Sequence, residues 1–449
     1  MSGLHYLPLT EDERQEMLQE LGVASVDHLF TDIPEKVKFQ GEMDLPPPLW
    51  EVEAEAHLSA LAARNYHLKE YPCFLGAGVY DHFSPAVVKP VLSRSEFYTS
   101  YTPYQAEVSQ GVLQSIFEYQ TMICQLTGME AANASMYDGA TAVAEAAVMS
   151  CRITHRDKVL VSRSVHPAYR QVLQTYFDAR DLQIEEIPMK QGHLDLEEAE
   201  ARIDQETAAL IVQNPNFLGR LEDYPGLAEL IHGRGGLLIA TVDPISLPLV
   251  KAPAEYGADL VAGEGQSLGN PPAYGGPLLG FFAAREKYIR RMPGRISGQT
   301  VDSEGNRGFV MTMQTREQHI RRGRATSNIC TNQALNALAA AVYLAALGPQ
   351  GLKEVAYLCF QKAAYAREKL TALTGYQLAC PGNFFKEFPV TVPGAPQEIN
   401  RRLLQKGIIG GLELSGFYPE LENSLLFCVT EKRTRGEIDE LVRQLEGWK

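Results

Sequence analysis

Residues 236–244 have the sequence GLLIATVDP, an apolar run that ends in an acidic residue and a proline. Seven residues with almost no polar side chain are typical of a strand buried on both faces of a parallel sheet. Asp243 follows this strand at its carboxyl end, the edge at which open α/β sheets bind their ligands. Asp243 therefore has two interpretations: the cap of a helix that Pro244 introduces, or a carboxylate that pairs with a bound cation.

Similar runs alternate with helical patterns around this strand, which predicts an α/β protein with a mostly parallel sheet covered on both faces. Strands are expected at residues 158–162, 183–188, 208–213, 259–263 and 277–283, with helices between them at 169–179, 194–203 and 224–232. After an Ala-rich helix at 331–347 the pattern changes. Helices at 351–373, 397–406 and 435–445 then alternate with strands at 385–392, 408–411 and 425–429.

These patterns predict three parts of the chain. An N-terminal helical arm takes residues 1–70, a large domain residues 71–347, and a smaller C-terminal α/β domain residues 348–449. Thr10 and Glu13 have the spacing of a capping box at the start of the first helix. Gly348 and Pro349 mark the second boundary, because neither residue favours the interior of a helix.

Composition excludes several classes of function. The 449 residues carry 41 Lys and Arg against 55 Asp and Glu, a formal net charge of −14. A nucleic-acid or anionic-membrane binder needs a positive face, so neither partner is expected. The seven cysteines are scattered and form no CxxC pair, so we expect no disulfide framework and no metal site. No signal peptide is visible and the apolar stretch 334–347 is too short to span a bilayer, which predicts a cytoplasmic protein.

Two further segments place candidate ligand-binding groups at the same sheet edge as Asp243. Gly139, Ala140 and Thr141 open an Ala-rich helix whose free N–H groups suit a phosphate, although Asp138 before them also fits an ordinary helix cap. His166 follows a strand end, where it either stacks on a flat cofactor or serves as a hydrogen-bonded structural residue. With these neighbours, Asp243 has the chemistry to ion-pair the pyridine nitrogen of pyridoxal phosphate.

Longer strings extend this pattern along nearly the whole chain. They are GAGVYDH at 76–82, FYTSYTPYQ at 97–105, EVSQG at 107–111, GEGQSLG at 263–269, YGGP at 274–277, QTREQHIRR at 314–322 and ATSNICT at 325–331. On these strings the chain resembles the fold-type I pyridoxal phosphate proteins, and more closely the P-protein of the glycine cleavage system. The resemblance is to the first of the two polypeptides into which many bacterial P-proteins are split.

The expected anchor of the cofactor is missing. In fold-type I enzymes a lysine about two dozen residues after the pairing aspartate forms the Schiff base, and this place holds Gln266. No lysine lies between residues 252 and 286. Lys251 follows Asp243 too closely, within the helix expected after Pro244, and Lys287 is expected on a solvated helix. The catalytic residues of this chain are therefore unknown, and Gly139, Ala140, Thr141, His166 and Asp243 are expected to form a remnant pocket.

The resemblance implies a role for the chain as subunit 1 of a glycine decarboxylase, with a second subunit in an α2β2 complex. That partner would hold pyridoxal phosphate covalently, decarboxylate glycine, and pass the aminomethyl group to the lipoyl arm of the H-protein. The resemblance places Thr326, Ser327 and Asn328 across the interface on the cofactor phosphate, or else as the cap of the following helix.

Three tyrosines spaced three apart form the last candidate site. Tyr98, Tyr101 and Tyr104 stand among small hydroxyl residues and a proline, and each offers an apolar ring with a polar tip. We expect them at a cleft mouth that grips the lipoyl arm or a small zwitterion, the alternative being that they cover a helix surface.

Two other functions fit the same sequence. The chain is a self-sufficient pyridoxal phosphate aminotransferase or lyase if Lys251 or Lys287 anchors the cofactor. It is a purely structural partner if none of its residues reaches an active site. The split P-protein reading predicts instead that the isolated chain is inactive and that the complex is active.

Overall fold

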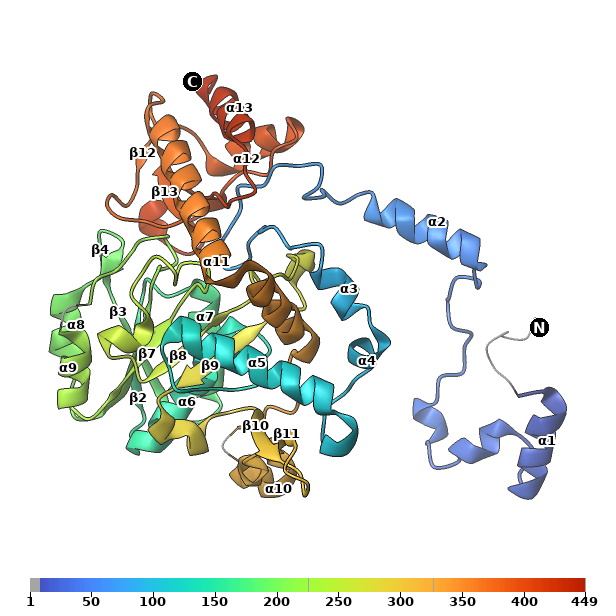
Figure 1. Cartoon of the computed structure of the whole chain (residues 1–449). Coiled ribbons are helices and arrows are strands. Elements are labelled where there is room, and N and C mark those ends of the chain that lie inside the picture. Colours follow the sequence, from blue (N-terminus) through green and yellow to red (C-terminus); the bar gives the residue numbers. More distant parts are fainter. Residues whose placement is uncertain (1–8, 225, 326, 449) are drawn as a thin grey trace. The chain divides into compact units, whose positions relative to one another are not determined.

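The computed structural model describes residues 9–224, 226–325 and 327–448. The chain divides into two units, Met1–Asn65 and Tyr66–Lys449, so the first division falls five residues before the expected one. The first unit contains α1 (Glu11–Glu20) and α2 (Glu51–Ala62), drawn in blue in Figure 1. Helix α1 begins at the predicted capping box, in which Thr10 and Glu13 each accept the other's backbone N–H.

The second unit is built on a seven-stranded sheet of order β1-β9-β8-β7-β6-β2-β3. Strands β2, β3, β6, β7 and β8 are parallel, whereas β9 runs antiparallel to both β8 and β1, which confirms a mostly parallel sheet. The strands are β1 (Ala131–Ala132), β2 (Lys158–Ser162), β3 (Gln183–Ile187), β6 (Thr207–Gln213), β7 (Leu237–Thr241), β8 (Leu260–Glu264) and β9 (Gly280–Ala284).

Helices cover both faces of this sheet. Alternate residues of β7 show the two sides, since Ile239 packs into the core beneath α6 and α7 while Ala240 packs on the opposite side, against α5 and α11. Both residues are fully buried, and burying a side chain the size of Ile239 contributes about 1.5–3 kcal/mol. The covering helices are α5 (Gln110–Thr127), α6 (Gly139–Thr154), α7 (Pro167–Asp178), α8 (Leu196–Arg202), α9 (Leu227–Gly233) and α11 (Ala334–Thr371).

Helix α11 is broken where the sequence predicts a boundary. Gly348 adopts φ 62° and ψ −179°, and Pro349 follows it inside the helix. By length and composition alone α11 is apolar enough to cross a membrane, but half of its most apolar window is buried inside the protein. It packs on α5 and on α3 (Val88–Leu92), which is the behaviour of a core helix.

The C-terminal part forms an antiparallel sheet of order β12-β13-β15-β14. Its elements are β12 (Gln377–Leu378), β13 (Glu387–Thr391), β14 (Leu412–Glu413), β15 (Ser424–Cys428), α12 (Pro396–Gln405) and α13 (Arg435–Glu446). The strand expected at 408–411 is wrong: Ile409 makes only an isolated bridge to Cys73, and β14 begins at Leu412. The apolar run there is buried against other elements without being paired along its length.

The helix expected after Pro244 is also wrong. Residues 244–249 form turns, and Asp243 accepts the backbone N–H of Ile245 in the first of them. The remaining elements of this unit are α4 (Ser95–Tyr98), α10 (Gln318–Arg321), β4 (Met189–Lys190), β5 (His193–Leu194), β10 (Ile296–Val301) and β11 (Arg307–Thr312).

Candidate functional site

The residues predicted to form a remnant pocket gather at the carboxyl edge of the large sheet. Asp243 follows β7, His166 caps α7 after β2, and Gly139 opens α6. Glu264, the last residue of β8, joins them. Each of these groups has a partner within the chain, and those partners decide what the edge can bind.

Asp243 is taken by a lysine from the C-terminal part of the chain. Lys386 Nζ lies 2.7 Å from Asp243 Oδ2, and 1% of the lysine side chain is exposed. The same ammonium lies 3.0 Å from His82 Nε2 and 3.4 Å from the centre of the Tyr80 ring. Burial by itself lowers the pKa of Lys386, but the Asp243 carboxylate raises the pKa above its usual value. Lys386 is therefore a protonated ammonium in a buried ion pair.

His166 stacks on a side chain of its own helix. The rings of His166 and Tyr169 are 4.7 Å apart at an interplanar angle of 19°, and the ring of Phe217 meets His166 edge-on at 4.7 Å. His166 Nδ1 accepts the N–H of Ala168, so Nε2 carries the proton that it donates to the Ala77 carbonyl at 2.9 Å. Burial lowers the pKa of His166, which keeps the ring neutral.

The start of α6 is occupied by a carboxylate. Glu264 Oε2 accepts the N–H of Gly139 at 2.9 Å, while Asp138 caps the helix by accepting the N–H of Thr141. A side chain on Gly139 would collide with the hydroxyl of Tyr169. Burial raises the pKa of Glu264 to about 7, against the effect of the backbone N–H groups that bond to it. Both interpretations of this turn thus have support: it is capped by Asp138, and it does bind an anion, which the chain supplies.

Gln266 stands where the anchoring lysine is expected. Its side chain is fully buried, accepts the N–H of Tyr80 at 2.9 Å, and donates to the carbonyls of Tyr80 and Asn270. The amide therefore fixes the 76–82 string in place. An amide nitrogen is not a nucleophile that forms a Schiff base.

Sequence reasoning missed the residues that fill this edge: Lys386, its neighbour Glu387, and Glu431. Glu387 accepts the N–H of Ala77 at 2.6 Å and the hydroxyl of Tyr80 at 2.8 Å, and burial raises its pKa to about 7. The available signal was a pair of charged residues inside the apolar run 384–390. Charged residues are almost never buried without partners, so such a pair points to a buried polar network.

Ligand-type atoms of His82, Cys359 and Glu431 lie within 4.8 Å of one another. Glu431 already accepts His82 Nδ1–H and the Phe83 N–H, each at 2.6 Å, and despite burial the bond from His82 holds the pKa of Glu431 at about 2. His82 Nε2 faces the Lys386 ammonium. A metal ion here would have to displace that cation, so the cluster is better described as a hydrogen-bonded chain.

The remaining predicted residues lie elsewhere. Thr326 is outside the described residues, Ser327 accepts the N–H of Ile329, and Asn328 is exposed. Helix α11 begins only at Ala334, so Ser327 and Asn328 do not cap it.

The three tyrosines do not share one cleft mouth in the structure. Tyr104 is 48% exposed and borders a pocket of about 310 Å³. Tyr98 and Tyr101 are 69% and 78% exposed.

Comparison with known proteins gives one family. A family model described as glycine cleavage system P-protein matches residues 4–445. The chain belongs to the glycine cleavage system P-protein family. It is 58% identical to a probable glycine dehydrogenase (decarboxylating) subunit 1 of Carboxydothermus hydrogenoformans, over 99% of this chain and 100% of the relative. The corresponding protein of Desulforamulus reducens is 56% identical, over 98% of this chain and 99% of its own length.

Solved structures agree with this assignment. A crystal structure of glycine decarboxylase (P-protein) in an inhibitor-bound form matches with a TM-score of 0.90 at 45% identity, over 98% of this chain and 99% of that one. A sphingosine-1-phosphate lyase of Burkholderia pseudomallei shares the fold, with a TM-score of 0.65 at 16% identity over 92% and 93% of the two chains. The fold is thus fold-type I, as expected from the sequence.

Pyridoxal phosphate does not fit the sheet edge of this P-protein chain. The carboxylate for its ring nitrogen is paired with Lys386, the ring of His166 is stacked on Tyr169, the N–H of Gly139 is bonded to Glu264, and the anchoring position is Gln266. Four independent features of a cofactor site are filled by the protein itself. The predicted remnant pocket is therefore not an open pocket.

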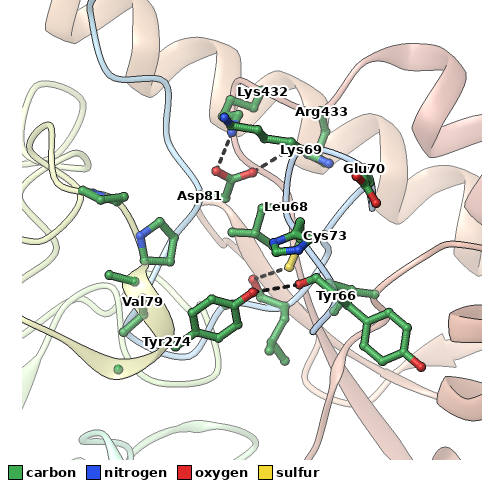
Figure 2. A pocket seen from close by; sticks show the side chains of 18 of the residues that line it. Tyr66, Leu68, Lys69, Glu70, Cys73, Val79, Asp81, Tyr274, Lys432 and Arg433 are labelled. Atoms are coloured by element: carbon green, nitrogen blue, oxygen red, sulfur yellow. Dashed lines mark hydrogen bonds and ion pairs between the residues drawn. The ribbon is translucent and has the colours of Figure 1, made fainter. Parts of the chain in front are cut away.

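An open cleft of about 1,090 Å³ lies on the other side of the 76–82 string, lined by Gly76, Val79 and Asp81. In Figure 2, Lys432 and Arg433 converge on Asp81 at one end, and Tyr274 points its hydroxyl at the Tyr66 carbonyl at the other. The lining holds three basic residues (Lys69, Lys432, Arg433) and three acidic ones (Glu70, Asp81, Glu437). These charges balance, so the cleft does not favour an ionic ligand.

Proposed function

We propose that this chain is subunit 1 of a two-subunit glycine decarboxylase and that subunit 2 holds pyridoxal phosphate covalently. Together the subunits release carbon dioxide from glycine and transfer the aminomethyl group to the lipoyl arm of the H-protein. One observation carries the division of labour: Gln266 occupies the anchoring position, and the carboxylate that would pair with the cofactor ring is bound to Lys386. The named relatives, each a probable subunit 1, support the assignment.

A self-sufficient enzyme has no suitable amine in this chain. Lys251 is exposed, and Lys287, with 65% of its side chain exposed, pairs with Asp259. Lys386 is buried at the right edge, but it is protonated and held by Asp243, and an ammonium cannot attack a carbonyl. These observations favour a cofactor held by the partner.

In the complex this chain completes the partner's site. Thr326, Ser327 and Asn328 are proposed to donate hydrogen bonds to the cofactor phosphate across the interface, and Tyr98, Tyr101 and Tyr104 to border the path of glycine or the lipoyl arm. A permanent interface of this kind is expected to be large and apolar at its centre. We expect an α2β2 complex in the cytoplasm.

Reconstitution tests the proposal. The two purified subunits are assayed singly and together for carbon dioxide released from carboxyl-labelled glycine in the presence of lipoylated H-protein, and borohydride reduction followed by peptide mapping locates the cofactor. We expect activity only from the mixture and the cofactor adduct only on subunit 2. An adduct on this chain, or decarboxylation by this chain alone, would overturn the proposal.

The purely structural alternative is tested in the same assay. Replacing Ser327 or Asn328 with Ala should lower activity while the complex remains assembled by size-exclusion chromatography. Full activity of both variants would favour a scaffold that does not reach the active site.

A further inference from the structure

A basic segment stands out in an otherwise acidic chain. Residues 285–324 carry ten Lys and Arg but only four Asp and Glu, whereas the whole chain has a net charge of −14. Charge gathered in one segment raises the local concentration of ligands of the opposite sign. The segment passes through β10, β11 and α10, at the bottom of the view in Figure 1.

Arg295 carries an unused hydrogen-bond donor in this segment. Its side chain is 8% exposed, and Nη2 donates to the Tyr104 hydroxyl at 3.1 Å and to the carbonyl of Cys330. Over the described part of the chain, no acceptor bonds to Nη1 or Nε. Arginine stays charged at any physiological pH, and a buried donor without a partner costs free energy. Nη1 therefore calls for an acceptor, ideally an anionic one.

Glu317 has the complementary need. Its side chain is 9% exposed, with Oε2 3.8 Å from Arg295 Nε and 3.6 Å from His319 Nδ1. Oε1 is buried and has no donor among residues 9–224, 226–325 and 327–448. Burial raises the pKa of this carboxyl group, because the basic neighbours compensate only part of the desolvation. Oε1 therefore calls for a donor, ideally a cationic one.

These two groups face one pocket of about 310 Å³, which is bordered by Tyr104, His319, Arg322 and Cys330 as well. A volume near 300 Å³ suits a small ligand. A ligand that carries both a carboxylate and an ammonium satisfies the unused donor and the unused acceptor at once.

We propose that this pocket, defined by Arg295, Glu317 and Arg322, binds a small α-amino acid as a zwitterion. The arginines take the carboxylate and Glu317 takes the ammonium. The inference deepens the proposed function and rests on it in one respect: the amino acid of that reaction is glycine. Ile329 and Cys330, which border the pocket, directly follow the Ser327–Asn328 turn, so the bound amino acid would lie beside the segment proposed to reach the partner's cofactor.

Calorimetric titration of the full-length chain without its partner tests the site. The probes are glycine, acetate, methylammonium and inorganic phosphate. We expect glycine to bind at least tenfold more tightly than acetate or methylammonium, because each of these lacks one of the two charge-assisted contacts. Phosphate or acetate binding as tightly as glycine would show a plain anion site and overturn the proposal, as would no binding of glycine at all.

Variants locate the binding. Glu317→Gln and Arg322→Gln each keep a similar shape and are expected to weaken glycine binding roughly tenfold or more. The matched control is Arg290→Gln, an exposed arginine of the same segment that does not border the pocket, and glycine affinity should not change. If glycine binds all variants equally, Arg295 and Glu317 simply pair with each other.

A second readout uses the assembled complex. Glu317→Gln should raise the KM for glycine while kcat stays within about twofold, since the pocket binds substrate without taking part in the chemistry. The outcome is independent of the reconstitution test. An active wild-type complex with an unchanged KM in this variant removes the amino-acid pocket but leaves the subunit assignment in place.

Discussion

Lys386 Nζ lies 2.7 Å from Asp243 Oδ2, in an ion pair that joins the start of β13 to the carboxyl end of β7. The two residues are far apart in sequence and come from different sheets. The pair occupies the place where the sequence predicts a cofactor contact, so a position read as a binding site serves to hold two parts of the chain together. The following predictions test the consequences of this filled edge.

Breaking the pair from one side should be costly. Lys386→Met leaves the Asp243 carboxylate buried without its counter-charge, and we expect the free energy of unfolding to fall by about 3–5 kcal/mol. The double variant with Asp243→Asn should recover much of this loss. Urea unfolding measures both, with Lys190→Met as the control, because 64% of the Lys190 side chain is exposed in its pair with Glu197 and its loss should cost less than about 1 kcal/mol. A loss for Lys386→Met as small as that of the control would show that the pair is unimportant.

Stability should fall as pH rises through the titration of Glu387. Its pKa is about 7 in the folded protein against 4.5 in the reference state, so between these values the folded chain binds more protons than the unfolded chain. Stability therefore decreases with pH across this window, by up to about 3 kcal/mol. Glu387→Gln removes this share and should raise stability at pH 8 relative to pH 5.

The measurement is the difference between Glu387→Gln and the parent in urea unfolding from pH 5 to 8. The difference is needed because His82 and His166, whose pKa values burial lowers, gain stability as pH rises toward 6.5 and so act in the opposite direction. Parallel curves for the two proteins would contradict the raised pKa of Glu387.

Gly139 should tolerate no side chain while Tyr169 keeps its hydroxyl. Gly139→Ala places a methyl group against the Tyr169 hydroxyl, and overpacking of this kind costs about 1–3 kcal/mol. Tyr169→Phe in the same chain should restore part of the loss, which thermal unfolding would detect. Gly111→Ala is the control, since it lies in α5 with open space around it and alanine should stabilise that helix by about 0.5–1 kcal/mol. Equal behaviour of both glycines would mean that the α6 turn is not crowded.

Restoring a lysine at the expected anchoring position should not restore a cofactor site. Gln266→Lys removes three hydrogen bonds and buries a second ammonium near the one already held by Asp243. We expect a loss of several kcal/mol in stability and no cofactor adduct after borohydride reduction. Gln299→Lys, at an exposed position of β10, controls for adventitious lysine labelling. An adduct formed specifically on residue 266 would show that the edge opens.

The hydroxyl turn should act on the partner's cofactor. Thr326→Ala in the assembled complex is expected to weaken retention of pyridoxal phosphate by about one to two powers of ten, the effect of one lost hydrogen bond to a charged group. Dialysis of the complex followed by cofactor quantitation measures this, with size-exclusion chromatography to check assembly. Unchanged retention in an intact complex would remove the turn from the cofactor site.

Local sequence patterns were sufficient for most of the architecture. The apolar run before Asp243, the strands beside it and the capping box at Thr10 depend on periodicity and short-range hydrogen bonds, which are written in neighbouring residues. The missing lysine was equally visible, because an absence at position 266 requires no coordinates. The strand expected at 408–411 and the helix expected after Pro244 failed where tertiary packing overrode local preference.

The tertiary structure alone decided what became of the site. Lys386, Glu387 and Glu431 reach the sheet edge from the C-terminal part of the chain, and no local pattern says which distant side chain meets which carboxylate. Asp243 and His166 looked the same in sequence whether they faced a cofactor or a neighbour. Burial decides between these outcomes, because a charge removed from water must be paired, and only folding determines whether the protein or a ligand supplies the partner.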